Sequence, residues 1–123
     1  MQNHLIKKSE WKNYFDQTSK HLLGHQVELE IVGLDIGDQI EEEWISLEGL
    51  SYDPRENILF VHTAETDHPI LTPVEVIASE EGSLIRSIVV RDTEGNLQIL
   101  KFRRPFQIET GAKAREDTSV TLY

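Results

Sequence analysis

Cysteine is absent from the chain, which excludes a disulfide framework, a zinc–thiolate site and a cysteine nucleophile. The absence fits a reducing compartment, and we expect a cytoplasmic protein. Long apolar runs are absent as well. No window approaches the roughly 18 apolar residues of a membrane span, and residues 1–8 lack the apolar core of a signal peptide. We therefore expect a soluble protein without a membrane partner.

Basic residues are scarce in the middle of the chain. Residues 25–81 contain fifteen acidic side chains and a single basic one, Arg55, so this block has a formal charge of −14, whereas the whole chain has −10. Nucleic-acid binding depends on Lys and Arg side chains that neutralise phosphates. The acidic block therefore predicts that no nucleic acid is a partner.

The length of 123 residues, of which 38% are hydrophobic, fits one domain that buries a sizeable core. We place this single globular domain at residues 1–106. Residues 107–123 are interpreted as a polar, mobile C-terminal tail, in which residues 120–123 are a possible edge strand.

Residues 9–23 are the only substantial helix that the sequence predicts. Four residues recur at spacings of four, three and four, which is the pattern of a helix with one buried face. They are Trp11, Phe15, Thr18 and Leu22. Ser9 is expected to cap the helix and Gly24 to end it. Trp11 and Phe15 are expected to bury against a sheet.

Strands follow the helix, because the hydrophobic period changes to two. The predicted strands span about residues 27–33, 44–52, 57–63, 73–78, 84–91 and 97–103. In the first of them, Glu28 and Glu30 alternate with apolar residues and are expected to face water. Gly49 interrupts the second strand, where a β-bulge would explain the change of phase. Pro105 is expected to end the last strand.

One helix followed by six locally connected strands predicts a mainly β (α+β) fold. We expect the N-terminal helix to pack on a six-stranded antiparallel sheet that is strongly bent or forms a half-open small barrel, with an Sm-like or SH3-like topology as one possibility. A topology of this kind carries no function by itself.

Five segments spread over residues 9–104 carry a resemblance to a known family. They are WKNYFD at 11–16, VELEIVG at 27–33, LEGLSYD at 47–53, HPILTP at 68–73 and GNLQILKF at 95–102. In these segments the chain resembles a family of small bacterial proteins known only as a domain of unknown function. The resemblance implies a small, soluble, stand-alone bacterial domain, and it implies no activity, cofactor or catalytic residue.

His62, Asp67 and His68 are the one cluster whose side chains suit a transition metal. A loop that joins two strands could fold His62 back toward His68, although the spacing matches no known metal motif. The alternative is a structural role, in which His68 forms a hydrogen bond with the backbone of its own proline-flanked loop and His62 ends a strand.

Two charged groups have competing readings. The acids around Glu41, Glu42 and Glu43 match no calcium-loop spacing, so we interpret them as a solvated face or a docking surface for a basic partner. The basic run that contains Lys101, Arg103 and Arg104 is too small for a nucleic-acid footprint. It is expected to pair with the acidic strands, within the molecule or across a homodimer interface.

No catalytic or cofactor motif is present in the sequence. We therefore expect no catalytic residue and no cofactor, and the leading hypothesis is a non-enzymatic acidic protein-interaction module that binds a protein partner or itself. The alternative hypothesis is a small-molecule or metal-binding protein built around His62, Asp67 and His68.

Overall fold

One α-helix and eight strands make up the computed structural model, which describes residues 2–22, 24–33 and 37–107. The elements are β1 (Gln2–Ile6), a 3₁₀ turn (Lys8–Glu10), α1 (Trp11–Ser19), β2 (Gln26–Gly33), β3 (Gly37–Asp53), β4 (Ile58–Thr63), β5 (Asp67–Leu71), β6 (Pro73–Glu81), β7 (Leu84–Asp92) and β8 (Leu97–Gln107). All neighbouring strands are antiparallel, in the order β1-β6-β7-β8-β2-β3-β4-β5.

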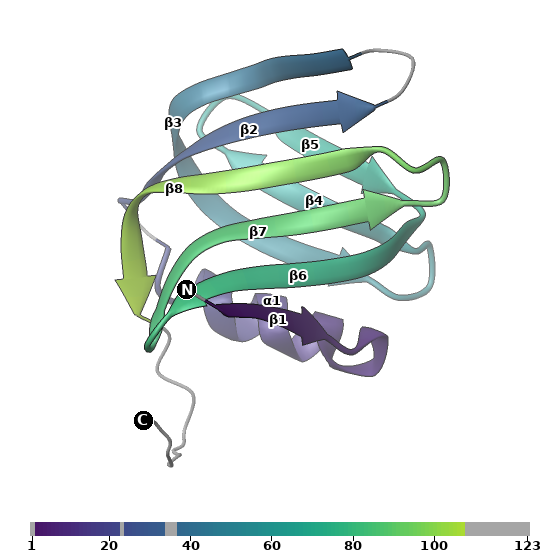
Figure 1. The fold of residues 1–123 in the computed structure, drawn as a ribbon, viewed down its shortest axis with the longest axis horizontal. Coiled ribbons are helices and arrows are strands. Elements are labelled where there is room, and N and C mark those ends of the chain that lie inside the picture. The colour runs from purple at the N-terminus through teal and green to yellow at the C-terminus, as the bar shows by residue number, and fades with distance from the viewer. Residues whose placement is uncertain (1, 23, 34–36, 108–123) are drawn as a thin grey trace.

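The sheet folds over at β3, a strand of 17 residues. The first half of β3 pairs with β2 and the second half pairs with β4, so two layers share this strand (Figure 1). The sheet is not closed into a barrel. The predicted mainly β fold, a helix on a bent, open antiparallel sheet, is confirmed, although the sheet has eight strands among the described residues rather than six.

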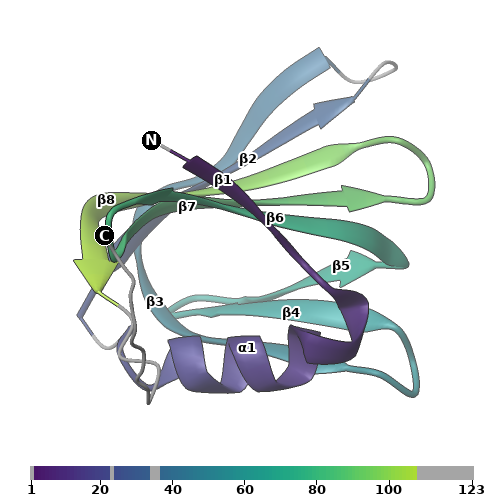
Figure 2. The same cartoon turned by 60° about the horizontal axis from the view of Figure 1, so that its bottom comes forward.

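The core lies between the two layers and against α1 (Figure 2). Its largest fully buried side chains come from the helix and from both halves of the sheet. They are Trp11, Phe15, Leu22, Leu29, Leu47, Leu50, Leu59, Ile70, Ile85, Ile88, Leu100 and Val27. The burial that the sequence predicts for Trp11 and Phe15 is therefore confirmed.

Helix α1 covers the edge of β3 at the point where β2 has left it. The Ser19 hydroxyl donates to the carbonyl oxygen of Leu50 over 2.6 Å and accepts a hydrogen bond from the Leu50 N–H over 2.8 Å. One side chain thus satisfies both backbone groups that a further strand would otherwise pair. The helix is an integral part of the sheet's edge.

The helix is shorter than the predicted 9–23. Ser9 lies in the preceding 3₁₀ turn, and the position before α1 is Glu10, whose side chain makes no capping bond. After Ser19 the chain continues in turns closed by backbone bonds from His21 to Thr18 and from Leu22 to Ser19, and these turns carry Leu22 into the core. Gly24 has the positive φ of +87° expected of a turn glycine, but it lies beyond the helix.

Two strands were not predicted, and both are edges of the sheet. β1 is polar and buries only Ile6, and β5 contains Pro69 and lies where a loop between two predicted strands was expected. Edge strands tolerate proline and need no alternating pattern. The bulge at Gly49 is confirmed, because Leu47 pairs with Thr63 and Gly49 pairs with His62.

Two other predictions are wrong. Glu28 and Glu30 do not face water: each is 8% exposed, because β2 lies between β8 and β3 and neighbouring side chains cover its outer face. Pro105 does not end β8, since the strand rejoins β7 at Phe106 after a bulge. The tail predicted for 107–123 lies outside the described residues from position 108 on, and so does the edge strand proposed at 120–123.

No helix among the described residues is long and apolar enough to cross a membrane.

Candidate functional site

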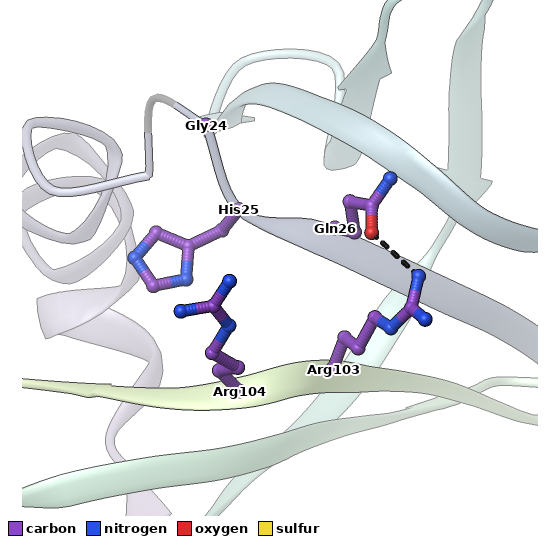
Figure 3. A pocket seen from close by; sticks show the side chains of 5 residues that line it. All are labelled: Gly24, His25, Gln26, Arg103 and Arg104. Atoms are coloured by element: carbon purple, nitrogen blue, oxygen red, sulfur yellow. Dashed lines mark hydrogen bonds between the residues drawn. The ribbon is translucent and has the colours of Figure 1, made fainter.

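A cavity of about 570 Å³ opens between the turn that precedes β2 and the C-terminal part of β8 (Figure 3). We call it the basic pocket. The described residues that line it are Gly24, His25, Gln26, Arg103 and Arg104. Two guanidinium groups and an imidazole thus share one cavity, and none of the five residues is acidic. In a chain of net charge −10 this is a local reversal of sign.

A bulge in β8 brings the two arginines together. Consecutive side chains of a regular strand point to opposite faces. Here Lys101 pairs with Ser87 and Phe106 pairs with Ile85, so residues 102–105 of β8 stand opposite the single residue Arg86. Bulges turn side chains toward new directions, and both arginines extend from β8 toward the turn before β2 (Figure 3).

Arg103 is held in place by two contacts. Its Nη1 donates to Oε1 of Gln26 over 2.8 Å, and its guanidinium lies 5.6 Å from the centre of the Trp44 ring. Trp44 has a φ of +50°, in the left-handed region that bulky residues rarely adopt. This conformation falls in a bulge of β3, where Val27 pairs with Ile45 and Leu29 pairs with Glu42.

Arg104 differs from Arg103 in its contacts. It is exposed, and it forms no hydrogen bond or ion pair with any residue that the structure describes. Its guanidinium fork is therefore available to a ligand in the pocket. Together, the anchored Arg103 and the uncommitted Arg104 place two cationic donor groups in one cavity.

The acids nearest along β2 share a third basic residue as their ion-pair partner. Lys101 Nζ lies 3.1 Å from a carboxylate oxygen of Glu30 and 3.6 Å from one of Glu28. A hydrogen bond from Asp38 and another from Lys101 lower the pKa of Glu30, while the same bond with Glu30 raises the pKa of Asp38. The hydrogen bond with Glu30 also raises the pKa of Lys101. The prediction that the basic run pairs with acidic strands within the molecule is confirmed for Lys101.

The structure separates the three candidate metal ligands. His62 Nδ1 lies 2.8 Å from Asp67 Oδ1, but His68 belongs to the other face of β5 and its Nε2 lies 2.9 Å from Oε1 of Gln98 on β8. His62 also lies 2.9 Å from the Ser51 hydroxyl through Nε2, so both of its ring nitrogens are engaged. The described part of the chain holds no group of three metal-binding side chains.

Ser51, His62 and Asp67 form a chain in the order of a catalytic triad. The carboxylate that would orient the imidazole is 70% exposed, whereas the triad acid is a buried group. Ser51 also sits within the β3–β4 ladder opposite Phe60, so its backbone groups lie in the sheet and not around an oxyanion. These bonds tie β3, β4 and β5 together, which is a structural role.

A family model described as "Family of unknown function (DUF5335)" matches residues 2–110. The chain belongs to this family. A protein of Aquifex aeolicus (strain VF5) titled "Uncharacterized protein" is 43% identical over 99 residues, which cover 80% of this chain and 89% of the relative. The resemblance to a bacterial family of unknown function is therefore confirmed. No solved structure matches the chain.

Sequence reasoning missed the pocket of this DUF5335 chain, although it singled out three of the five lining residues. The run at 101–104 is visible as a basic cluster, and Gly24 as a turn. Their proximity depends on the pairing of Val27 with Phe102, which brings positions 24–26 next to positions 103 and 104. The one local signal is Pro105, a residue that cannot donate to a sheet ladder and is typical of a bulge or an edge.

Proposed function

We propose that the chain is a non-enzymatic interaction module that docks a basic protein partner on an acidic arm. The acidic arm is the exposed first half of β3, with Asp38, Ile40, Glu41 and Glu43 as its contact residues. The observation that carries the proposal is the position of these residues. They lie on a strand that β2 pairs on one side, and no described strand pairs with residues 40–45 on the other.

Two acids of the arm, Glu41 and Glu43, carry charges that no described residue neutralises. Neither Glu41 nor Glu43 forms an ion pair with any residue in the described ranges. Ile40 is 54% exposed beside them and offers apolar contact area. Charged side chains and bulges protect an edge strand from pairing with copies of itself. The same charges attract a basic partner over a distance and increase its association rate.

Binding assays with matched variants test this proposal. The full chain is immobilised as wild type, as the arm variant Glu41→Gln/Glu43→Gln and as the control Glu56→Gln/Glu65→Gln, which removes two exposed acids elsewhere. We expect a basic host protein to bind the wild type and the control and to be lost from the arm variant. Calorimetry of the purified pair should give an affinity that falls with added salt. Equal binding to all three proteins would contradict the proposal.

Self-association belongs to the same class of function, and the β1 edge favours it. Among the described strands β1 pairs only with β6, and its residues include no Asp, Glu, Lys, Arg or Pro. Leu5 in this strand is 59% exposed. An edge without protecting charges is a template for a second strand. We propose that two copies pair through β1 in a symmetric homodimer.

Small-molecule binding is the alternative class of function. It is supported by the basic pocket and not by the segment that holds His62, Asp67 and His68.

For the location we propose the cytoplasm, which is supported by the absence of cysteine from the chain.

A further inference from the structure

We propose that the basic pocket binds a small oxyanion of charge −2, a phosphate group or a dicarboxylate carried by a small molecule. This site is distinct from the acidic arm. It would give the DUF5335 chain a ligand in addition to a protein partner. The inference rests on the charge of the lining, the fixed position of Arg103 and the size of the cavity.

The charge of the pocket matches a dianion. Arg103 and Arg104 supply two permanent positive charges, and His25 supplies an imidazole from the opposite wall (Figure 3). Lys101 is already engaged by Glu28 and Glu30, which keeps those acids from pairing with the arginines. A ligand with two negative charges therefore neutralises the site without displacing an internal ion pair.

The geometry of the pocket suits oxygen acceptors. A guanidinium group binds carboxylate and phosphate oxygens through two parallel N–H donors. Arg103 is held by Gln26 and by the ring of Trp44, so little side-chain freedom is lost when it meets a ligand. The bulge of β8 directs the Arg104 side chain toward the same cavity.

The size of the cavity and the acidity of the chain disfavour large polyanions as ligands. The cavity of about 570 Å³ is within the range of roughly 300–1,000 Å³ that small-ligand sites occupy. A nucleic acid or an anionic membrane would also meet the acidic block of residues 25–81, whose formal charge is −14. Repulsion from that block leaves small ligands as the class that fits.

Thermal unfolding and calorimetry of the full chain test the site with three probes: inorganic phosphate, glycerol phosphate and succinate. Sodium chloride at equal ionic strength is the reference. A ligand at about ten times its Kd should raise the Tm by about 4 °C. Preference for the phosphates or for succinate identifies the oxyanion, and either result supports the site. No shift beyond that of sodium chloride with any probe would overturn it.

Two variants with the same charge change locate the binding. Arg104→Gln should weaken the affinity at least about tenfold, because it removes a charge-assisted donor pair. Arg91→Gln removes an arginine that pairs with Glu75 outside the pocket, and it should leave the affinity unchanged. Equal losses in both variants, or no loss in Arg104→Gln, would overturn the proposal.

A measurement on the wild type alone keeps the test independent of how the variants fold. Titration with the tightest probe, followed by NMR, should shift the ring signals of His25 and the side-chain amide of Gln26. The ring signals of His4, in β1, serve as the reference and should not move. Shifts spread over both histidines alike would indicate a general charge effect and would overturn the assignment to the pocket.

Discussion

Trp11 joins three parts of the molecule through one side chain. Its indole N–H donates to the carbonyl oxygen of Ile6 over 2.9 Å, and its ring meets that of Tyr52 edge-on at 5.1 Å. It is 1% exposed. The residue therefore links the end of β1, the start of α1 and the second half of β3.

Replacing this side chain should remove a large share of the stability. We expect Trp11→Ala to lower the free energy of unfolding by about 3–5 kcal/mol, the usual loss for a large aromatic truncated in a core. Urea unfolding followed by circular dichroism measures the change. Asn13→Ala, at an exposed position of the same helix, is the control and should cost less than about 1 kcal/mol. A Trp11→Ala variant as stable as the control would mean that the helix is peripheral.

Ser19 satisfies two backbone groups at once, so replacing it should cost more stability than the loss of one small hydroxyl group suggests. In Ser19→Ala both the N–H and the carbonyl of Leu50 lose their partner. We expect a loss of about 1–3 kcal/mol and faster hydrogen exchange at the Leu50 amide. Ser9→Ala is the matched control, because Ser9 is exposed and lies in the 3₁₀ turn. Unchanged exchange at Leu50 would contradict the edge-capping role.

The ladder formed by Glu28, Glu30 and Lys101 makes the β2–β8 pair sensitive to pH. The pKa of Glu30 is lowered by its bonds to Asp38 and Lys101, so its carboxylate form stabilises the fold. This contribution is present above the ordinary pKa of glutamate and is lost as the pH falls through the lowered value. Lys101 is half exposed, which limits the gain through solvent screening.

Lys101→Met should therefore destabilise the protein in a pH-dependent way. We expect a loss of about 1 kcal/mol at pH 7 that shrinks as the pH falls below the ordinary pKa of glutamate, because protonated carboxyl groups no longer need the cation. Unfolding experiments across this pH range measure the difference between variant and wild type. Lys12→Met, which breaks an exposed pair with Asp16, should show little loss at any pH. A loss independent of pH in Lys101→Met would point to packing and not to charge.

The elements that the sequence predicted are those whose side chains alternate or recur within one segment. The stripe of α1 and the inner residues of β2, β4 and β7 are local patterns, and a local pattern is enough to predict them. β1 and β5 were not predicted, because an edge strand buries few side chains. The solvent exposure of Glu28 was wrongly predicted for a related reason, since alternation cannot reveal that a strand is central and that side chains of its neighbours cover its outer residues.

The candidate site was less predictable than the fold, because it depends on pairing between distant segments. The sequence shows Arg103 and Arg104 as neighbours, and regular strand geometry would separate their side chains. Only the bulge of β8 places them in one cavity with Gln26, which lies 77 residues away along the chain from Arg103. The bond between Ser51 and His62 likewise joins different strands.

At the scale of the whole molecule, the structure changes the basis for a dimer. The sequence suggested that Lys101, Arg103 and Arg104 would pair with acidic strands, either within the molecule or in a second copy. β2 and β8 are neighbours in the same sheet, and Lys101 already pairs with Glu28 and Glu30. Lys101 is therefore not expected to join two copies, and the edges of the sheet are further candidates for an interface.

Pairing through the β1 edge predicts the molecular mass of the protein in solution. Pairing of two β1 strands would add backbone hydrogen bonds and cover Leu5, so the dimer should persist when salt is raised, unlike one held by exposed charges. Light scattering at tens of micromolar protein measures the mass. We expect a dimer for the wild type, and a monomer for Leu5→Lys because a lysine protects an edge. Leu71→Lys, at the exposed β5 edge, is the control and should remain dimeric. A monomeric wild type, or a dimer abolished only by Leu71→Lys, would rule out β1 as the interface.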